Sequence, residues 1–397
     1  MIVLELFGNL KQKELPLQKK TMETNPKILE QLLSLGAGYE IERVEYSVVE
    51  ILSTQNTDKY GKKTYSQVEI YLQLSKDYPF PLGHKVHSYE ARRWRHLDLF
   101  EHRCYLICEI PLLKEESTGK IKQLEFSFAR PYSGFTQKLE FRILELFKEN
   151  NNLNATGRLL GEYPQRIQKI FTDYMKTVPP IVKAGKKMAM DETNRKKGHD
   201  YMTLFVNLDA EKPEIVDIEE GKGRDTIEKF VQKCENPEEI EHLGMDMSAA
   251  FISGAQEYLP HAAITYDKFH VVKLLNGHLS DLETKSNFEK IIEAKNLITE
   301  NLYKQENLLE QKAFLTFFAD WTQEELFSNK ISKTIFRYMD GMVQVAVSQI
   351  TNGILEGINS KIQVLKRIAR GFRHFENFKQ RVFFAFKPLK FNSSNIT

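Results

Sequence analysis

Two stretches decide the fold: KKMAMDETNRKKGHDYMTLFVNLD (residues 186–209) and LGMDMSAAFISGAQEYLPHAAITYDKFH (residues 243–270). Their apolar runs are short, rich in β-branched and aromatic residues, and separated by turn-forming residues, which indicates β-strands. We expect five strands, over KKMAMDE, HDYMTLFVNLD, PEIVDIEE, IEHLGMDM and AAITYDKFH. Helices are expected over GRDTIEKFVQKCE, where apolar residues recur at i, i+3 and i+4, and over MSAAFISGAQEYLP, which ends at a proline.

The predicted order is three strands, helix, strand, helix, strand and a later helix, which is that of an RNase-H-like fold. Asp191, Asp246 and Asp267 are expected where strands end, and Glu356 lies on the later helix. Phosphodiester cleavage is assisted by two divalent ions roughly 3.5–4 Å apart, and Mg²⁺ takes oxygen ligands. The pattern predicts that Asp191 bridges two Mg²⁺ ions, Asp246 holds one and Glu356 completes the second site. The alternative for each aspartate is a cap or turn residue.

Longer segments resemble a known family. MDETNRKKGHDYMT (residues 190–203), MDMSAAF with PHAAITYDKFHVVKLLN (residues 245–276) and NGILEGINSKIQVLKRIARGFRHFENFKQR (residues 352–381) resemble signature segments of bacterial insertion-sequence transposases of the ISL-three family. RRWRHLDLFEHRCYLICEIP (residues 92–111) is similar to the N-terminal region of that family. The likeness spans about residues 40–388. It implies a DDE transposase that binds the terminal inverted repeats of its element, cleaves DNA ends and transfers strands.

The resemblance also implies the roles of individual residues. Asp191, Asp246 and Glu356 match the catalytic triad, with two Mg²⁺ ions or Mn²⁺ as cofactor, while Asp267 and His270 match an accessory Asp-x-x-His motif. Both Asp246 and Asp267 are candidates for the second acid, and we favour Asp246 because a fourth-strand position suits the metal better. A homo-oligomer on double-stranded DNA is expected, because two ends must be joined. The alternatives are a nuclease without strand transfer and a decayed or domesticated DNA-binding protein without catalysis.

The predicted architecture is α+β with several domains. An insertion is expected because helix-like sequence fills most of the 110 residues between Asp246 and Glu356. Trp321 within it is either a contact for DNA ends, as the resemblance implies, or a core aromatic residue. The expected parts are an N-terminal arm (1–30), a small β-rich domain (31–132), a helix-turn-helix with linker (133–180), the first part of the RNase-H-like core (181–270), an all-α insertion (271–350), and the Glu356 helix with a basic C-terminal segment (351–397).

The β-rich region departs from the family that it resembles, which carries a four-cysteine zinc site there. YPFPLG (residues 78–83) and KEESTGK (residues 114–120) stand where the paired cysteines are expected. Structural zinc needs about four N or S ligands, so we predict a degenerate, zinc-ribbon-like domain without zinc. Cys104 and Cys108 are predicted to be buried thiols. The residues in place of the thiolates are Tyr78, Leu82 or Pro81, Glu115 and Thr118.

The whole chain has a formal charge of only +2, so the clustering of basic residues says more about DNA binding than the net charge does. Three segments predict contacts with DNA: an arginine-rich run around Trp94, the third predicted helix after Pro164, and the basic helix after Glu356. The alternatives are a solvated hairpin with Trp94 in the core, a plain helical connector and a solvated helix. The predicted DNA-binding residues are Arg92, Arg93, Arg95, Gln165, Arg166, Lys169, Lys361, Lys366, Arg367, Arg370 and Arg373.

Composition and motifs also exclude several classes. With 41% hydrophobic and 28% charged residues, the chain is typical of soluble globular proteins. No stretch approaches the roughly 20 apolar residues of a membrane helix, and MIVLELFGNLKQKELP has too short an apolar run for a secretory signal. Three cysteines fit a reducing cytoplasm. GKGRD (residues 221–225) lacks the spacing of a phosphate loop, so no nucleotide cofactor is expected.

Overall fold

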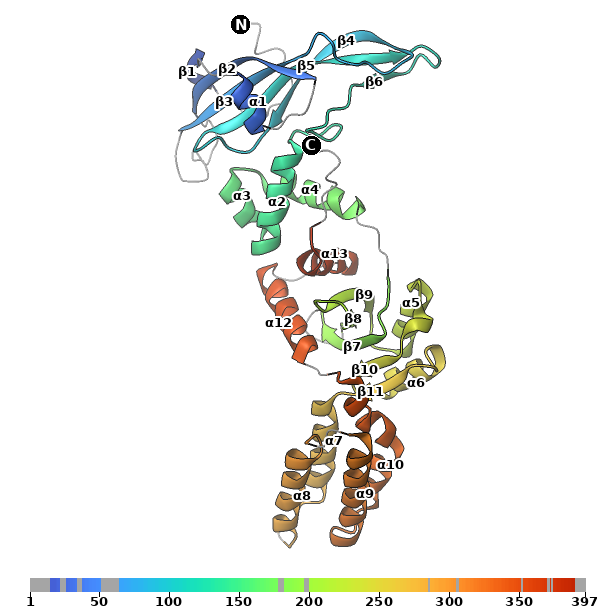
Figure 1. The fold of residues 1–397 in the computed structure, drawn as a ribbon. Helices are drawn as coiled ribbons and strands as arrows, with labels where there is room; N and C mark the ends of the chain where they lie inside the picture. Colours follow the sequence, from blue (N-terminus) through green and yellow to red (C-terminus); the bar gives the residue numbers. More distant parts are fainter. Residues whose placement is uncertain are drawn as a thin grey trace. The chain divides into compact units, whose positions relative to one another are not determined.

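The chain divides into two compact units, each built from a sheet and helices (Figure 1). In the computed structural model, one unit comprises Met1–Thr177 with Leu389–Thr397, and the other comprises Val178–Pro388. The predicted α+β class is confirmed at this level. The residues described are 15–21, 26–33, 38–50, 64–177, 182–195, 200–284, 286–304, 307–350, 353–369, 372 and 374–389.

A six-stranded sheet forms the β-rich part of the first unit. Its order is β1-β2-β3-β5-β4, with β6 pairing β5; β3 and β5 are parallel and the other pairs antiparallel. Residues 15–21, which the sequence places in an arm, form edge strand β1. The elements are β1 (Leu15–Thr21), α1 (Pro26–Leu33), β2 (Tyr39–Glu50), β3 (Thr64–Leu74), β4 (His84–Arg95), β5 (Arg103–Glu115) and β6 (Ile121–Gln123).

The core of this sheet is aromatic and contains both cysteines of β5. Trp94 is buried and its ring lies 5.2 Å from that of Phe126. Cys104 and Cys108 are buried, and burial raises the pKa of both thiols to about 12, so they remain protonated. The prediction of buried thiols is confirmed. At the positions expected to replace zinc ligands, Tyr78 packs on Tyr39 and Thr118 donates a hydrogen bond to Glu115.

Three helices follow in the same unit, where the sequence predicts three. They are α2 (Gln137–Asn150), α3 (Leu153–Leu160) and α4 (Pro164–Thr177). The asparagine run breaks the chain between α2 and α3, because Asn151 adopts a left-handed conformation and Asn152 caps α3 through Ala155 N–H. Gly161 makes the next turn with a φ of 65°. Left-handed backbone favours glycine, so this turn is encoded locally.

The second unit contains a five-stranded mixed sheet of order β11-β10-β7-β8-β9. β7, β8 and β9 are antiparallel neighbours, whereas β10 is parallel to both β7 and β11. The order of elements along the chain is the predicted one. They are β7 (Lys187–Asn194), β8 (Tyr201–Asn207), β9 (Glu214–Glu220), α5 (Arg224–Lys233), β10 (His242–Met245), α6 (Ala249–Tyr258) and β11 (Ala263–Tyr266).

Helices cover both faces of this sheet (Figure 1). Met188 and Met190 of β7 pack with residues of α5 and α6, whereas Ala189, between them, packs with α12 (Gly353–Ile368) and α13 (Phe375–Phe386). Successive strand side chains point to opposite faces, so a strand buried on both faces reads as one apolar run. Asp191 has the parity of Ala189 and therefore faces α12.

Two predicted strand ends differ from the structure. β7 continues for three residues past Asp191, because Glu192, Thr193 and Asn194 still pair with β8. Asp191 thus lies inside the strand, not at its end. β11 stops at Tyr266, and Asp267 caps the helix that starts at Lys268 by accepting the N–H of Phe269. His270 is therefore helical rather than part of the fifth strand.

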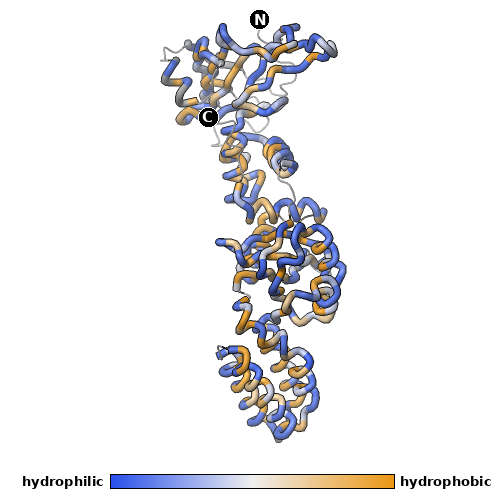
Figure 2. Tube along the Cα trace, turned by 45° about the vertical axis from the view of Figure 1, so that its right-hand side comes forward, coloured by the Kyte–Doolittle hydropathy of each residue, from blue (hydrophilic) through white to orange (hydrophobic). Residues whose placement is uncertain are grey.

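Where an all-α insertion is predicted over residues 271–350, the described residues from Lys268 to Ser348 form helices and no strand, beginning slightly earlier than expected. Figure 2 shows hydrophobic residues interspersed with hydrophilic ones along its helices. Its buried residues join the same core cluster as Met188 and Met190. Trp321 is half-buried, and its ring stacks on Phe318 at 6.2 Å. The helices are α7 (Lys268–Asp281), α8 (Phe288–Asn301), α9 (Leu308–Glu325), α10 (Asn329–Val343) and α11 (Val345–Ser348).

None of the helices in the described parts of the chain combines the length and the apolar character needed to cross a membrane.

Candidate active site

Three aspartates lie at one level of the mixed sheet. The pairing of the parallel strands aligns Lys187 with His242 and His242 with Ala263, and each aspartate comes four residues after its member of that row. The Asp267 N–H still donates to Met245 O at 2.9 Å, so the ladder reaches this level. Neighbouring strands are about 4.8 Å apart. We call Asp191, Asp246 and Asp267 the acidic row.

Small residues lie two positions before the acidic row on the same face. They are Ala189, Gly244 and Thr265, paired across the three strands. A Cβ added to Gly244 would lie 2.7 Å from Cγ2 of Ile350, so glycine alone leaves room for this side chain. Thr265 donates a hydrogen bond to Ser348 at 3.0 Å. The segment that leads into α12 therefore packs closely beneath the acidic row.

Helix α12 runs beside β7 and is joined to it by side-chain contacts. Asn359 donates to Asp191 Oδ2 at 2.6 Å, Gln363 donates to Thr193 at 3.3 Å, and Lys366 donates to the carbonyl of Asn194. Asn359 and Gln363 are four helical residues apart, a rise of about 6 Å, and their partners Asp191 and Thr193 are two strand residues apart, about 6.6 Å. The contacts therefore advance by similar distances along both elements. Helix and strand therefore run in the same direction.

This packing places Glu356 next to the acidic row. Glu356 lies one turn before Asn359 on α12, and residues three apart share a helix face. Its side chain is exposed, and its negative charge contributes to raising the pKa of Asp267. The predicted fourth acid is thus brought from a distant part of the sequence to the same region as Asp191, Asp246 and Asp267.

Burial and neighbouring negative charges raise the pKa of two acids of the row, Asp191 and Asp267. Burial raises the pKa of Asp191 to about 6, and the charge of Asp246 adds to the rise. The hydrogen bonds from Glu192 N–H and Asn359, together with His270, act in the opposite direction. Burial also raises the pKa of Asp267. A site whose carboxylates repel one another gains most from a bound cation.

Local contacts occupy two of these acids, a turn contact for Asp246 and a helix cap for Asp267. Asp246 Oδ1 accepts the N–H of Ser248 at 2.9 Å, and Asp267 caps α7. His270 Nε2 lies 3.7 Å from Asp267 Oδ2. Capping accounts for where these side chains sit in the fold, so the alternative drawn from the sequence has a physical basis. It does not account for their alignment with Asp191, which caps no helix and sits within a strand.

The donor chemistry of this region suits a hard divalent cation. Carboxylate and amide oxygens are the ligands that Mg²⁺ prefers, and Oδ1 of Asn359 is buried and accepts no hydrogen bond. Within the described ranges, no three His, Cys, Asp or Glu side chains approach closely enough to hold a metal ion. The backbone aligns the acids, and their side chains would have to turn toward one another to enclose a cation.

A cavity of about 510 Å³ opens beside the acidic row. Asp246 and Ser248 line it from the start of α6, His270, Lys273 and His278 from α7, and Lys330 from α10. Lys330 is bonded to Asp281 at 2.9 Å. This cavity was not predicted from the sequence, although His270, Lys273 and Gly277 recur at i, i+3 and i+7, which is a signal of one helix face.

The predicted DNA contacts around Trp94 differ in accessibility. Arg92 is half-buried, 3.6 Å from Glu90. Arg93 stacks on Tyr105 and lies 3.3 Å from Glu69. Arg95 is only 3% exposed and forms ion pairs with Asp98 and with Glu162 of the turn before α4. The guanidinium of Arg95 therefore ties the sheet to the helices, and Trp94 is a core residue.

The predicted recognition helix α4 has the expected faces. Ile167, Ile170 and Phe171 are buried, whereas Gln165 and Lys169 are exposed. Arg166 is exposed but engaged, because it bonds Glu162 at 2.6 Å and stacks over Phe135 at 3.9 Å.

Along α12 and beyond, the basic residues divide into two groups. Lys361 and Arg367 are exposed, and Lys366 bonds the β7 backbone. Lys379 of α13 instead bonds Asp217 at 2.7 Å, and Lys387 pairs with Glu214 at 3.6 Å, so these two cations are directed to acids of β9. Arg370 and Arg373 lie outside the described residues.

Comparison with known proteins supports one family. The family profile for transposases of the ISL-three DDE type matches residues 188–295 and 282–382, which include the acidic row and Glu356. The chain is 24% identical over 352 residues to the transposase for insertion sequence element IS1001 of Bordetella parapertussis, covering 76% of this chain and 86% of that protein. Transposases act on DNA, and the DDE type generally uses divalent metals. The chain belongs to the ISL-three family of insertion-sequence transposases.

Proposed function

We propose that the protein binds the terminal inverted repeats of an insertion sequence, cleaves the DNA at those ends and transfers the strands to a target. The observation that carries the proposal is the alignment of Asp191, Asp246 and Asp267, with α12 bringing Glu356 to the same face. The strand order β11-β10-β7-β8-β9, with β7 to β9 antiparallel and β10 and β11 added in parallel to β7, supports an RNase-H-like core.

Asp191, Asp246 and Glu356 are the residues that would hold two Mg²⁺ ions, or Mn²⁺. The bound ions would generate the attacking hydroxide and stabilise charge on the leaving oxygen. Asp191 would be the central ligand, because its carboxylate is oriented from two sides, by Glu192 N–H at 2.8 Å and by Asn359 at 2.6 Å. Asp246 is favoured over Asp267 as second ligand because Asp267 lies at the outer strand, next to His270.

Asp267 and His270 have a supporting role in the proposal. The imidazole lies within 3.7 Å of the carboxylate and lines the cavity beside Asp246. A histidine held by a carboxylate can accept or donate a proton near neutral pH. It would move protons at the oxygens of the reacting phosphate without being a metal ligand.

DNA contacts are proposed for the exposed basic residues. Lys361 and Arg367 are exposed on α12, the helix that carries Glu356, and Gln165 and Lys169 on α4 form the exposed face of a helix-turn-helix. Such a helix enters the major groove while neighbouring residues hold phosphates. Joining two ends requires a homo-oligomer on double-stranded DNA. The substrate places the protein in the bacterial cytoplasm, at the nucleoid.

The decisive experiment compares the wild type with Glu356→Gln on a DNA fragment that carries the element's own ends. We expect Mg²⁺-dependent cleavage at the ends by the wild type and a loss of at least about a hundredfold in the variant, because the charge that holds one ion is removed. Glu356 is exposed, so the variant should fold normally. Electrophoresis of end-labelled fragments, with circular dichroism as the folding control, measures both.

Each outcome of that comparison has a distinct meaning. Equal cleavage by both proteins would reject Glu356 as the third acid. Binding by the wild type without cleavage would support the alternative, a decayed DNA-binding protein. Products in which a free 3′-hydroxyl has been joined to a second DNA would separate a transposase from a simple nuclease.

A further inference from the structure

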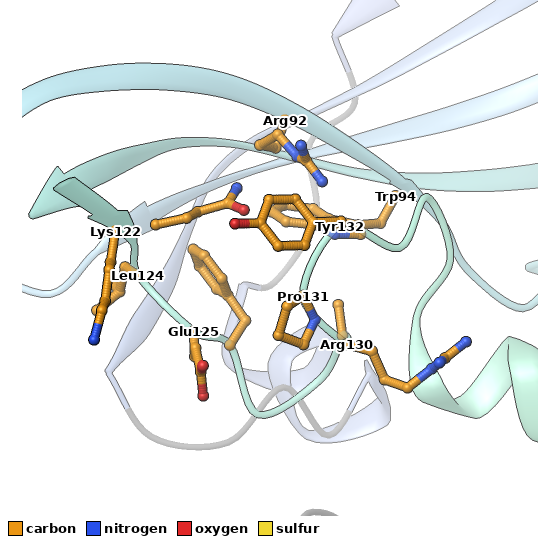
Figure 3. A pocket seen from close by; sticks show the side chains of 11 residues that line it. Arg92, Trp94, Lys122, Leu124, Glu125, Arg130, Pro131 and Tyr132 are labelled. Carbon is orange, nitrogen blue, oxygen red and sulfur yellow. The ribbon is translucent and has the colours of Figure 1, made fainter. Parts of the chain in front are cut away.

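A second cavity, of about 270 Å³, opens in the β-rich unit (Figure 3). Strand β4 contributes Arg92 and Trp94 to its lining, β6 contributes Lys122, and the turn before α2 contributes Tyr132. The cavity is slightly smaller than the roughly 300–1,000 Å³ of pockets that enclose a drug-sized ligand. It therefore suits a single flat ring with one charged substituent.

Tyr132 is placed there at an energetic cost. Its side chain is 80% exposed, and its backbone has a φ of 59°. A turn with proline before a residue of positive φ favours glycine at the second position, and a bulky residue there is strained. Because the ring is largely exposed, burial of apolar surface does not offset this strain. Strained residues of this kind cluster at ligand clamps.

Hydrogen bonds within the turn and to Glu140 of α2 fix the turn that carries Tyr132. Ser133 N–H donates to Arg130 O at 3.1 Å, which closes the turn. Arg130 donates two hydrogen bonds to Glu140 of α2, at 2.6 and 2.9 Å, and Ser133 Oγ donates to the same carboxylate at 2.7 Å. Figure 3 shows the Arg130 side chain directed away from the Tyr132 ring. The backbone that carries the tyrosine is thus fixed before any ligand binds.

The surroundings of Tyr132 combine a stacking surface with positive charge. Trp94 is buried in the lining, and Arg92 lies near the Tyr132 ring in Figure 3. Lys122 is exposed. Arg130 donates two hydrogen bonds to Glu140, whereas Arg92 has only a longer contact of 3.6 Å to Glu90, so Arg92 and Lys122 are the cations of the lining that can face a ligand. Gln123 and Glu125 also line the cavity and offer polar atoms to a ring edge.

We propose that this cavity binds one unpaired nucleotide of DNA, with its base stacked on Tyr132 and its phosphate held by Arg92 and Lys122. Aromatic side chains beside cations bind single strands because every base has a π-face. A base inside a duplex has both faces covered by its neighbours and cannot reach such a ring. The inference rests on the proposed DNA-processing function and adds to it a subsite for a nucleotide displaced from the duplex.

The test measures binding of the full chain to a fluorescent single-stranded oligonucleotide and to the duplex of the same sequence. Tyr132→Gly removes the ring at a position that glycine favours, so it should keep or raise the Tm. We expect it to weaken single-strand binding roughly 5- to 150-fold, the loss for one stacked base, and to leave duplex binding nearly unchanged. Tyr132→Phe, which retains a stacking ring, should bind like the wild type.

Phe100 provides a matched control in the same unit. It is 99% exposed with a φ of 54°, sits in the Leu99–His102 turn and does not line the cavity. Phe100→Gly removes an exposed aromatic ring from the same strained conformation, and we expect single-strand affinity equal to that of the wild type. An equal loss in both glycine variants would overturn the proposal, because the effect would not depend on the cavity.

The outcomes separate this inference from the proposed function. Wild-type affinity of Tyr132→Gly for the single strand would overturn the nucleotide subsite, while Glu356-dependent cleavage of duplex ends would still stand. If the wild type binds the duplex and not the single strand, the nucleotide subsite is likewise overturned and the proposed function still stands. Failure of the wild type to bind either form of DNA would reject both the subsite and the proposed function.

Discussion

At the scale of single residues, Asp191 is the side chain whose state matters most. Its carboxyl is half-buried, and its pKa is raised from 3.8 to about 6. A raised pKa favours the neutral form, so its contribution to stability is present at low pH and is lost as the pH rises through 6. Above that pH the metal-free protein carries a buried charge, which a divalent cation would compensate.

We therefore predict that Asp191→Asn stabilises the metal-free protein at pH 8. The difference should be roughly 2–3 kcal/mol, since each pKa unit corresponds to about 1.4 kcal/mol. It should shrink as the pH falls from 6 toward 4, where the wild-type carboxyl is protonated. Urea denaturation in the presence of a chelator, at pH 8 and pH 4.5, measures this. A wild type at least as stable as the variant at pH 8 would show that burial does not govern this carboxyl.

At the scale of elements, the packing of helix α12 against strand β7 explains where the candidate site lies. Helix α12 can approach β7 only because the strand row beneath the aspartates is made of small side chains. Gly244 of β10 is the critical position, since its backbone has an ordinary conformation and only the nearby Ile350 excludes a Cβ, at 2.7 Å. The close approach is thus a matter of packing volume rather than of backbone freedom.

Gly244→Ala is accordingly predicted to destabilise the protein by about 1–3 kcal/mol, the usual cost of overpacking a core. Ile350→Ala shortens the opposing side chain. In that background Gly244→Ala should cost less stability than it does in the wild type. Chemical denaturation of the four proteins gives the coupling energy. Strictly additive effects would mean that the two side chains do not compete for the same space.

The sequence predicts the elements of this sheet better than their ends. Short apolar runs mark all five strands, but the pairing of Glu192–Asn194 with β8 depends on a partner strand and extends β7 past Asp191. The DKFH segment continues an apolar run, and only the side chain of Asp267, acting as a cap, reveals the start of α7.

Long-range contacts could not be predicted at all. Asn359 bonds Asp191, which is 168 residues away in the sequence. Arg95 forms an ion pair with Glu162, and two helices lie between these residues in the chain. A local pattern shows that an arginine is present, but burial depends on which carboxylate the fold brings to it. For the same reason the turn that holds Tyr132 gave no signal beyond its proline.

On the scale of the whole molecule, the two units have separate cores. The buried cluster around Trp94 draws its residues from 33–129, and the two clusters of the mixed sheet draw theirs from 182–382. Cooperative unfolding follows a shared core, so each unit should unfold as its own transition. The chain has two tryptophans, and Trp94 and Trp321 report on one unit each.

We predict two thermal transitions that these tryptophans resolve. With Trp321 replaced by Phe, fluorescence should follow the first unit, and with Trp94 replaced by Phe, the second. Adding Gly244→Ala should lower the transition seen by Trp321 by several degrees and leave that seen by Trp94 unchanged. A single coincident transition in both backgrounds, shifted equally by Gly244→Ala, would show that the units unfold as one.

The late position of α12 has a consequence for protein synthesis. Residues 186–270 already contain the whole acidic row, but Asn359 and Glu356 are added only after the four long helices of the insertion. Domains fold in order as they leave the ribosome. A nascent chain, or one ended by a premature stop codon before α12, would carry the proposed DNA-binding residues of α4 but lack Glu356 of the proposed triad. Translation itself would thus delay the capacity to cut until nearly the whole polypeptide has been made.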